Sequence, residues 1–499
     1  MSVRSLPVVP TDEQRRARDA FVADGDLAVV AGAGTGKTST LILMAAATRR
    51  RGLYLAFNRA TAADAIRRFG ANVDCRTAHS LAFAATGRQF RARLDTSARI
   101  PSVQVARILG ITRDLEVGHA RISQVHQARL VTGMVRRFCF SSDTEPLVRH
   151  MEPVNGLDPQ ATAYVASALV SFAVKSWEDI RAPNGKLRFE HDHYMKMWAL
   201  TSPVLRGEFI LLDEAQDTNP VLEEIFLAQS AQRVCVGDPA QQIYAWRAAR
   251  DVMTGFHGRH VQLTRSFRFG QAIADVANRW LGHAASQMRL IGAGPAESRV
   301  ARTQAADAVL CRTNADVMQE VLAFLESGTR VAITGGGDAL RKIAEAAQQL
   351  KAGRRTSHPE LFLFPTWGAV QEYVENDSAA RDLKSLVRLV DTHGAETVIH
   401  AVRRLSPEDD AQVTISTAHK AKGREWASVR IGPDFGPPFV GDGQAQPPLS
   451  LEEARLIYVA VTRAKHTLDI SGLAWADDYE KAVARAKNRP ERVRKATGS

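Results

Sequence analysis

The feature that most constrains the fold is an apolar segment that runs directly into a glycine-rich loop. Residues 27–31, LAVVA, predict a buried strand, residues 32–38, GAGTGKT, a loop, and residues 39–49 a helix. In such an arrangement backbone N–H groups and the helix N-terminus face a phosphate, the Lys37 ammonium reaches the β- and γ-phosphates, and the Thr38 hydroxyl holds Mg²⁺. A chance glycine turn is the weaker alternative, because the strand precedes the loop where it should. The loop alone predicts a nucleoside triphosphatase and no more specific function.

A pair of carboxylates follows a second apolar segment. Residues 208–212, EFILL, lead into Asp213 and Glu214. The carboxyl end of a strand is where a parallel sheet presents catalytic groups. We expect Asp213 to bind Mg²⁺ through water, and Glu214 to orient and deprotonate the attacking water. Acidic pairs after strands often only cap helices or form turns, but together with the phosphate loop this pair indicates a hydrolytic site.

Composition narrows the class of protein. The 499 residues suggest about three or four domains. The net charge of +11 and the pI near 9.7 indicate a polyanionic partner, nucleic acid or an anionic membrane surface. The apolar stretches fall short of the roughly 20 residues of a membrane span, and the N-terminus does not resemble a signal peptide. The four cysteines form no CxxC pair, which argues against a disulfide framework, a zinc site or an iron–sulfur cluster. We expect a cytoplasmic protein without membrane partners, nucleoid-associated if prokaryotic or from a phage.

Nine segments in a fixed order, counting the phosphate loop, resemble superfamily 1A DNA helicases of the UvrD/Rep type. Within this family, four segments are most similar to the F-box DNA helicase branch: AFNRATAADAIRRF, HDHYMKMW, GDPAQQIYAWRAA and LTRSFRFG. We nevertheless expect no F-box before the motor. The other eight segments are TDEQ (11–14), LYLAFN (53–58), RTAHS (76–80), DEAQD (213–217), VGDPAQQIYAWR (236–247), LTRSFR (263–268), ISTAHKAKGREW (415–426) and EEARLIYVAVTRAK (452–465).

The resemblance implies an α/β fold with two RecA-like parallel-sheet motor cores, helical accessory insertions, and ATP with Mg²⁺ bound between the cores. Gln14 would read the adenine edge, Phe267 would stack on its face, and Glu425 would lie near the ribose. Many relatives have an arginine where this chain has Ser39, which leaves the strictness of the ATP preference open. The implied nucleotide-binding residues are Gln14, Ala31, Gly32, Ala33, Gly34, Thr35, Gly36, Lys37, Thr38, Ser39, Phe267 and Glu425.

Catalysis is implied for Lys37, Asp213, Glu214, Gln241, Arg268 and Arg463, with Thr38 and Asp213 as the Mg²⁺ ligands. Gln241 would contact the γ-phosphate or the attacking water. The guanidinium groups of Arg268 and Arg463 match the charge that spreads over the phosphoryl group during transfer. A solvated surface charge is the alternative reading for each arginine.

Single-stranded DNA is the implied track, with junctions between single and double strands. Such binding combines cations for the backbone with aromatic faces, worth about 1–3 kcal/mol per stacked base. A core position is the alternative for Phe57, whereas Trp246 lies in a polar setting. The cluster at 191–193, HDH, suggests a metal, but no third ligand follows at helical spacing. The implied DNA contacts are Phe57, Asn58, His79, Tyr244, Trp246, Arg247, Thr417 and His419.

The positions of the motifs and the helical spacing of apolar residues predict that the chain consists of two cores and two insertions. Larger relatives carry a far bigger domain at the second insertion, so its reduced size puts autonomous unwinding in doubt. The predicted parts are the first core (1–88 and 188–255), its helical accessory insertion (89–187), the second core (256–337 and 410–499) and its reduced accessory insertion (338–409).

Two classes of function remain open. The first is an ATP-driven translocase and helicase that moves 3′→5′ on DNA, a polarity implied only by the family. The second is a DNA-stimulated ATPase that strips recombinase from single strands or senses DNA ends for a protein partner such as a recombinase, nuclease or polymerase, with little unwinding of its own. An RNA-directed motor is a weaker alternative. A purely structural or membrane-surface role is disfavoured because no catalytic residue of the motifs is lost.

Overall fold

The structure is a computed structural model. It describes residues 9–95, 100–118, 120–154, 157–243, 251–294, 297–358, 361, 364–376, 381–438 and 447–487. The predicted DNA contacts Tyr244, Trp246 and Arg247 lie outside these residues. The chain divides into two compact units, Met1–Ala31 with Gly36–Leu263, and Gly32–Thr35 with Thr264–Ser499. Among the described residues, none of the helices has both the length and the apolar character needed to cross a membrane.

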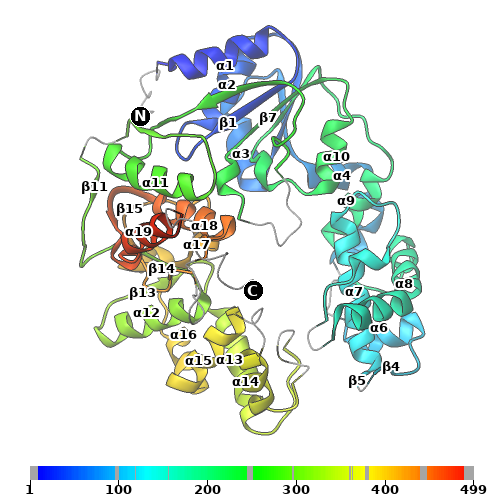
Figure 1. Cartoon of the computed structure of the whole chain (residues 1–499). Helices are drawn as coiled ribbons and strands as arrows, with labels where there is room; N and C mark the ends of the chain where they lie inside the picture. The colour runs from blue at the N-terminus through cyan, green and yellow to red at the C-terminus, as the bar shows by residue number, and fades with distance from the viewer. Residues whose placement is uncertain are drawn as a thin grey trace, which may run out of the picture. The chain divides into compact units, whose positions relative to one another are not determined.

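The first unit is built on a parallel sheet of six described strands in the order β3-β2-β6-β7-β1-β8. Figure 1 labels the neighbouring strands β1 and β7 of this sheet. Parallel strands need crossover connections and are covered on both faces, which is why they read as continuous apolar runs. The predicted strand at 27–31 is confirmed without a shift. The strands are β1 (Leu27–Ala31), β2 (Gly52–Ala56), β3 (Val73–Thr77), β6 (Phe209–Leu212), β7 (Gln232–Gly237) and β8 (Arg259–Leu263).

One predicted boundary is wrong. Residues 256–263, which we expected to open the second core, lie in the first unit. Strand β8 pairs in parallel with β1 from Leu27 opposite Arg259 to Ala31 opposite Leu263. Without β8, the strand that leads into the phosphate loop would present an unpaired edge. The finer division of each unit into core and insertion stays a prediction.

Side chains of the first sheet alternate between two apolar clusters, because successive residues of a strand face opposite sides. In β2, Tyr54 packs with residues of α1, α2 and α3, whereas Leu53 and Leu55 pack with residues of α4, α9 and α10. The sheet is thus covered on both faces, as a doubly wound fold requires. The helices are α1 (Asp12–Val22), α2 (Lys37–Ala46), α3 (Arg59–Arg68), α4 (Ala78–Ala85), α9 (His191–Ala199) and α10 (Pro220–Leu227), with short 3₁₀ turns η3 (Ala215–Asp217) and η4 (Pro239–Gln241).

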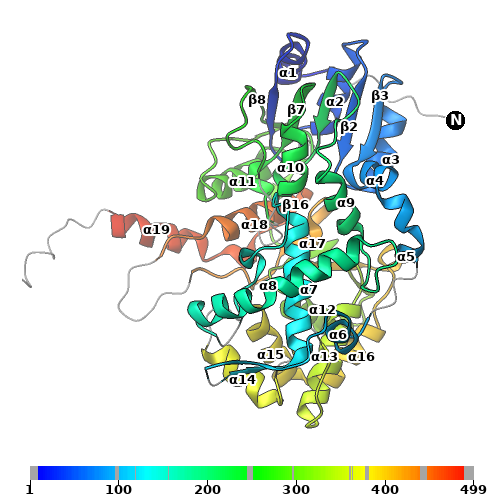
Figure 2. The ribbon, with the colours of Figure 1, turned by 90° about the vertical axis from the view of Figure 1, so that its right-hand side faces the viewer.

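The interval between α4 and α9 is mostly helical, as predicted (Figure 2). Its long helices α7 and α8 pack together, and their buried residues share one apolar cluster with β2 and β6 of the sheet. A small antiparallel hairpin, β4 with β5, was not expected. The elements are η1 (Gly87–Phe90), α5 (Arg91–Asp95), α6 (Ser102–Leu109), β4 (Leu115–Val117), β5 (Ala120–Ile122), α7 (Gln124–Phe140), η2 (Val148–His150) and α8 (Pro159–Arg181).

The second unit contains another parallel sheet of six described strands, in the order β11-β16-β15-β12-β14-β13. The strands are β11 (Arg299–Val300), β12 (Ala308–Cys311), β13 (Val331–Ile333), β14 (Val413–Thr417), β15 (Trp426–Ile431) and β16 (Ala464–Asp469), with a separate pair β9 (Arg265–Ser266) and β10 (Ile291–Gly292).

The reduced insertion does not form a core of its own. Buried residues of α13 to α16 belong to the same apolar cluster as Val309 of β12, Ile333 of β13 and Ile415 of β14. The insertion therefore extends the core of the second unit. The helices of this unit are α11 (Gln271–His283), α12 (Asn314–Glu326), α13 (Asp338–Lys351), α14 (Trp367–Asn376), α15 (Arg381–His393), α16 (Ala395–Arg403), α17 (Ala418–Ala421), α18 (Leu451–Val461) and α19 (Ala476–Lys487), with 3₁₀ turns η6 (Glu408–Asp410) and η7 (Ser471–Leu473).

Candidate active site

The glycine-rich loop has the backbone that its sequence requires. Gly34 and Gly36 have φ values of +75° and +82°, a left-handed conformation that glycine adopts without steric cost. Gly36 is the N-cap of α2, so Lys37 and Thr38 form the first turn of a helix whose N-terminus attracts anions. Within the loop, the Thr35 hydroxyl donates to the Gly32 carbonyl oxygen (2.9 Å). This bond closes a turn inside the loop.

The acid pair meets the phosphate-loop lysine inside the first unit. The Lys37 ammonium donates to Glu214 Oε2 over 2.7 Å. Strands β1 and β6 are parallel members of one sheet, with β7 between them, so the segments after both strands open at the same edge. Asp213 is buried at the end of β6, where its Oδ1 accepts from the Glu214 backbone N–H (2.9 Å) and its Oδ2 from the Tyr54 hydroxyl.

Glu214 has an unusual backbone for its residue type. Its φ of +52° and ψ of +45° lie in the left-handed region, which non-glycine residues rarely adopt. Such strain costs of the order of 1–3 kcal/mol and persists where the surroundings hold it in place. Here it turns the chain sharply after β6, so that consecutive carboxylates are held by different partners. Strain of this kind is common at functional sites.

Burial and opposing charges control protonation at the site. Burial alone would lower the pKa of Lys37, but the carboxylates of Glu214, Asp213 and Asp238 outweigh it, so the pKa is raised. Burial and the neighbouring Glu214 carboxylate raise the pKa of Asp213 to about 6, against the opposing effects of Lys37 and Tyr54. The lysine therefore stays charged at neutral pH.

A hydrogen-bond chain connects the acid pair to Gln241, the residue predicted to contact the γ-phosphate or the attacking water. Gln216 Nε2 donates to Glu214 Oε2 (2.7 Å), and Gln216 Oε1 accepts from the Asp238 backbone N–H (3.0 Å). Gln241 Nε2 in turn donates to Asp238 Oδ2 (2.6 Å). Glu214 and Gln241 are thus linked through Gln216 and Asp238. Our sequence reasoning assigned no role to these two linking residues. Their positions inside the quoted segments DEAQD and VGDPAQQIYAWR were the available signal.

The residues present fit a magnesium ion. Mg²⁺ takes oxygen ligands and usually combines one or two protein groups with phosphate oxygens and water. The Thr38 hydroxyl at the start of α2 and the Asp213 carboxylate supply oxygens of this kind, next to a helix N-terminus that would face phosphates. Tyr54, buried in β2 and bonded to Asp213, was also missed, because a tyrosine in an apolar strand reads as core.

The remaining residues predicted to bind the nucleotide lie in different environments. Gln14 is buried in the first turn of α1, where its Oε1 accepts from the Thr11 backbone N–H (3.0 Å) in a capping box. Ala31 and Ala33 are buried, and Ser39 is exposed and accepts from Arg68 (3.3 Å). The role of Gln14 in reading adenine stays a prediction.

The predicted second-unit residues cluster around the end of α18. Arg268 Nε donates to Glu425 Oε2 (2.7 Å), and its Nη1 donates to the Thr462 carbonyl oxygen (3.0 Å). Arg463 is only 1% exposed, and its guanidinium donates to the carbonyl oxygens of Val459 (2.9 Å) and Arg424 (3.3 Å). The alternative of a solvated surface charge is therefore wrong for Arg463. Phe267, next to Arg268, is 39% exposed, as a stacking side chain would need to be.

The described candidates for DNA contact follow strand ends in both units. Phe57, directly after β2, is 53% exposed, which rules out the core alternative. Asn58 caps α3 by accepting from the Thr61 N–H (2.8 Å), and His79 in α4 pairs with Asp192 (3.2 Å). In the second unit, the buried Thr417 caps α17, the short helix that carries His419. These positions fit the predicted contacts but do not test them.

The three residues at 191–193 have three different partners instead of converging on one point. His191 Nδ1 bonds to the Tyr194 hydroxyl (3.0 Å), Asp192 pairs with His79, and His193 Nδ1 accepts from the Glu190 backbone N–H (2.9 Å). Burial lowers the pKa of His193 to about 4, although the Asp192 carboxylate favours the charged form. A structural role thus explains His193 without a metal.

This burial predicts a pH-dependent stability. Between about pH 6.5 and pH 4 the unfolded chain binds a proton at His193 and the folded chain does not, so stability falls as pH decreases, by a few kcal/mol at most. Replacing His193 with asparagine keeps an acceptor for the Glu190 N–H and removes the titrating group. We expect urea unfolding of H193N to lose much less stability between these pH values. The same substitution at the exposed His191 should retain the wild-type slope, and equal slopes in all three proteins would contradict this.

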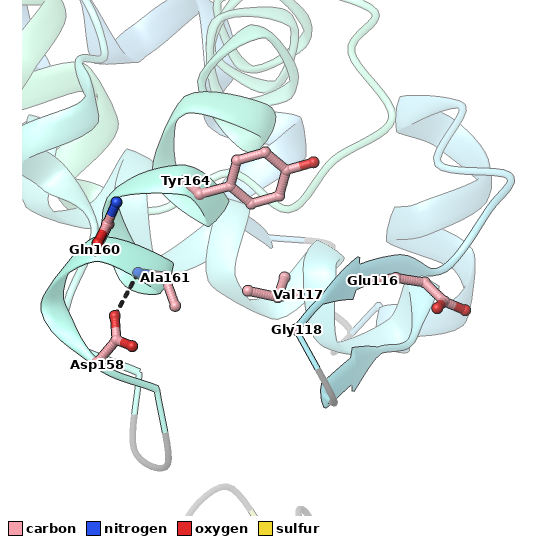
Figure 3. Close-up of a pocket in the computed structure, with 7 residues that line it drawn as sticks. All are labelled: Glu116, Val117, Gly118, Asp158, Gln160, Ala161 and Tyr164. Carbon is pink, nitrogen blue, oxygen red and sulfur yellow. Dashed lines mark hydrogen bonds between the residues drawn. The ribbon is translucent and has the colours of Figure 1, made fainter.

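A separate cavity of about 400 Å³ lies between β4 and the start of α8 (Figure 3). None of the predicted site residues lines it. Its two charged groups are carboxylates, which disfavour a DNA backbone, and Asp158 already caps α8 by accepting from the Ala161 N–H (2.7 Å). The cavity is lined by Glu116, Val117, Gly118, Asp158, Gln160, Ala161 and Tyr164.

The fold and the site together define a class of protein. Two parallel sheets, one of which presents a phosphate loop and an acid pair at the same edge, are the two RecA-like motor cores of a P-loop NTPase, with helical insertions. The UvrD/REP helicase N-terminal domain matches residues 197–254, and the UvrD-like helicase C-terminal domain matches residues 368–474. Parts of the chain thus match the N- and C-terminal domain models of UvrD-like helicases, and the resemblance that the motifs indicate is confirmed.

Similar proteins carry helicase names. F-box DNA helicase protein 1 of Schizosaccharomyces pombe is 29% identical over 92% of this chain and 57% of its own length. F-box DNA helicase 1 of Gallus gallus is 29% identical over 92% of this chain and 49% of its own. ATP-dependent DNA helicase UvrD2 of Mycobacterium tuberculosis is 27% identical over 54% of this chain and 48% of its own. The chain therefore spans about half the length of the curated relatives it matches.

Proposed function

We propose that this protein is an ATP-dependent DNA translocase and helicase that moves 3′→5′ on single-stranded DNA. The observation that carries the proposal is the 2.7 Å contact between the phosphate-loop Lys37 and Glu214, beside a buried Asp213. A lysine, a metal-binding carboxylate and a base are the groups that hydrolysis of a nucleoside triphosphate needs. The matches to UvrD-like helicase domains direct this chemistry toward DNA.

The hydrolytic step can be assigned to residues of the first unit. Lys37 and Gln216 both donate to Glu214 Oε2. When ATP occupies the loop, the Lys37 ammonium would turn to the β- and γ-phosphates and release Glu214 to accept a proton from the attacking water. Mg²⁺, held at Thr38 and Asp213, would neutralise phosphate charge. Gln241 would report the γ-phosphate through Asp238 and Gln216, to which it is already linked.

The proposed DNA track follows the strand ends of the same sheet. Strands β2 and β3 are parallel neighbours, and Phe57 and His79 follow their carboxyl ends. An exposed aromatic ring beside a polar contact residue suits stacking of bases without sequence preference. The net charge of +11 would favour a polyanion electrostatically. Junctions between single and double strands are the substrates that such a motor would unwind.

A second candidate function is favoured by one observation. The reduced insertion at 338–409 packs into the apolar core of the second unit and adds no separate core. A motor without a large accessory domain is suited to displacing bound proteins, such as a recombinase, or to sensing DNA ends for a nuclease or polymerase partner. Strand displacement on a 3′-tailed duplex, compared with removal of a protein from single strands, separates the two candidates.

The central test measures ATP hydrolysis with single-stranded DNA, duplex DNA and RNA in parallel, across salt concentrations. We expect single-stranded DNA to stimulate hydrolysis most. We expect the half-saturating DNA concentration to rise about 10- to 100-fold between 50 and 200 mM salt, because backbone contacts release counterions. A half-saturating DNA concentration that does not change with salt would argue against binding through the DNA backbone. Equal stimulation by RNA would argue against specificity for DNA.

A further inference from the structure

Tyr54 is a fully buried residue of β2 whose hydroxyl contacts the predicted metal ligand. Its relative exposure is 0%, and its ring packs against that of Phe69 with centroids 4.8 Å apart. The hydroxyl donates to Asp213 Oδ2. A buried tyrosine hydroxyl needs a hydrogen-bond partner, and this one has a carboxylate at the end of the neighbouring strand.

The register of the sheet explains why the two side chains meet. Tyr54 lies opposite Leu211, and Asp213 is two residues further along the chain from Leu211. Because strand residues two apart face the same side of a sheet, Tyr54, Leu211 and Asp213 all point to one face. The backbone pairing continues past the strand, since the Asp213 N–H donates to the Leu55 carbonyl oxygen (3.1 Å). A tyrosine is long enough to reach the carboxylate from this position, and phenylalanine would fill the same space without the contact.

The Asp213 carboxylate is thereby held at both oxygens. Oδ1 accepts from the Glu214 backbone N–H, and Oδ2 accepts from Tyr54. Each ionised carboxylate oxygen accepts more than one hydrogen bond, so both retain capacity for a metal or its bound water. Groups that hydrogen-bond to a metal ligand commonly fix its orientation and strengthen metal binding.

We propose that Tyr54 is a positioning residue of the metal site, which holds the Asp213 carboxylate in the orientation that binds Mg²⁺ with the nucleotide. The inference rests on the proposed function, because it assumes that the first unit binds a nucleotide with a metal. It gives a role to a residue for which the resemblance implies none, although Tyr54 lies within the LYLAFN segment. Tyr54 itself contacts neither substrate nor metal in this role and acts only through Asp213.

The test is Tyr54→Phe, with Mn²⁺ as the probe. Binding of Mn²⁺ to the ADP-saturated protein is followed by the loss of the free Mn²⁺ EPR signal, and binding of ADP alone is measured in EDTA. We expect Y54F to bind Mn²⁺ on the order of 10-fold more weakly and to bind metal-free ADP as the wild type does. The matched control is Tyr194→Phe, which removes another buried tyrosine hydroxyl of the same unit, bonded to His191. It should leave both affinities unchanged.

The outcomes separate the inference from the proposed function. Unchanged Mn²⁺ affinity in Y54F would overturn the positioning role. Equal weakening of Mn²⁺ and metal-free ADP binding, together with a lower urea midpoint, would show that Tyr54 supports the fold of the site instead, and would also overturn it. If the wild-type protein bound no nucleotide in either condition, the proposed function itself would fail.

Discussion

Replacing Glu214 with glutamine is expected to reduce DNA-stimulated ATP hydrolysis by about 10²- to 10⁴-fold, the usual contribution of a general base. Glutamine keeps the size of the side chain and its ability to accept from Gln216, but it cannot take a proton from water. Nucleotide and single-stranded DNA should still bind, because neither depends on the base. Steady-state ATPase with saturating DNA, and separate binding titrations of DNA and a nucleotide analogue, measure the two parts.

A matched control lies at the other end of the same strand. Glu208 immediately precedes β6, and its carboxylate accepts from the Arg51 backbone N–H (2.8 Å), far along the strand from Glu214. E208Q should hydrolyse ATP at nearly the wild-type rate. Wild-type hydrolysis by E214Q would show that another group, or no protein group, takes the proton.

Replacing Arg268 with alanine is expected to lower the rate of hydrolysis by about 10³- to 10⁵-fold, if its guanidinium stabilises the charge that spreads over the transferred phosphoryl group. Arg268 is oriented in the second unit by Glu425 (2.7 Å) and by the Thr462 carbonyl oxygen (3.0 Å). Arg268→Lys should restore little of the hydrolysis rate, because lysine lacks the planar guanidinium that matches phosphate oxygens. Single-turnover hydrolysis at saturating ATP isolates this effect from binding.

Arg279 provides the control for a purely structural role. It is an ion-paired arginine of the same unit, bonded to Glu480 (2.8 Å) and Asp477 (2.7 Å), outside the motifs. R279A and R268A should change the urea midpoint by similar small amounts, whereas only R268A should lose hydrolysis. A rate for R268A within about tenfold of R279A would mean that another cation serves the phosphate, for which Arg463 is the next candidate.

Sequence reasoning was most successful where a whole function is contained in one short segment. The phosphate loop requires glycines at left-handed positions directly after a strand, and Gly34 and Gly36 have that backbone. The acid pair is likewise contiguous with the apolar strand that presents it. The helical character of residues 89–187 was predicted because apolar residues recur there every three to four positions, and α6, α7 and α8 lie in this interval. The boundary near residue 256 was wrong because an edge strand with exposed residues, β8, gives no continuous apolar run.

The site could be predicted only in part, because several of its contacts join distant positions. Tyr54 and Asp213 are 159 residues apart, and an aromatic residue in an apolar strand gives no sign that its hydroxyl has a catalytic neighbour. Gln216 lies in a motif, but its bond to the backbone of Asp238 depends on how β6 and β7 are paired. The TDEQ segment also has the spacing of a capping box, which Thr11 and Gln14 form in α1, but our sequence reasoning assigned Gln14 only to adenine.

The residue order by itself determined the chemistry: a loop of backbone donors with a lysine, a carboxylate pair at a strand end, and enough surplus positive charge for a polyanion. These follow from local backbone requirements and from residue type, which do not depend on distant parts of the chain. Only the tertiary structure decided which groups touch, such as Lys37 with Glu214, Tyr54 with Asp213, and the reduced insertion with the core of the second unit. The physical reason is that strand register and helix packing set distances between segments far apart in the chain, and no local pattern encodes them.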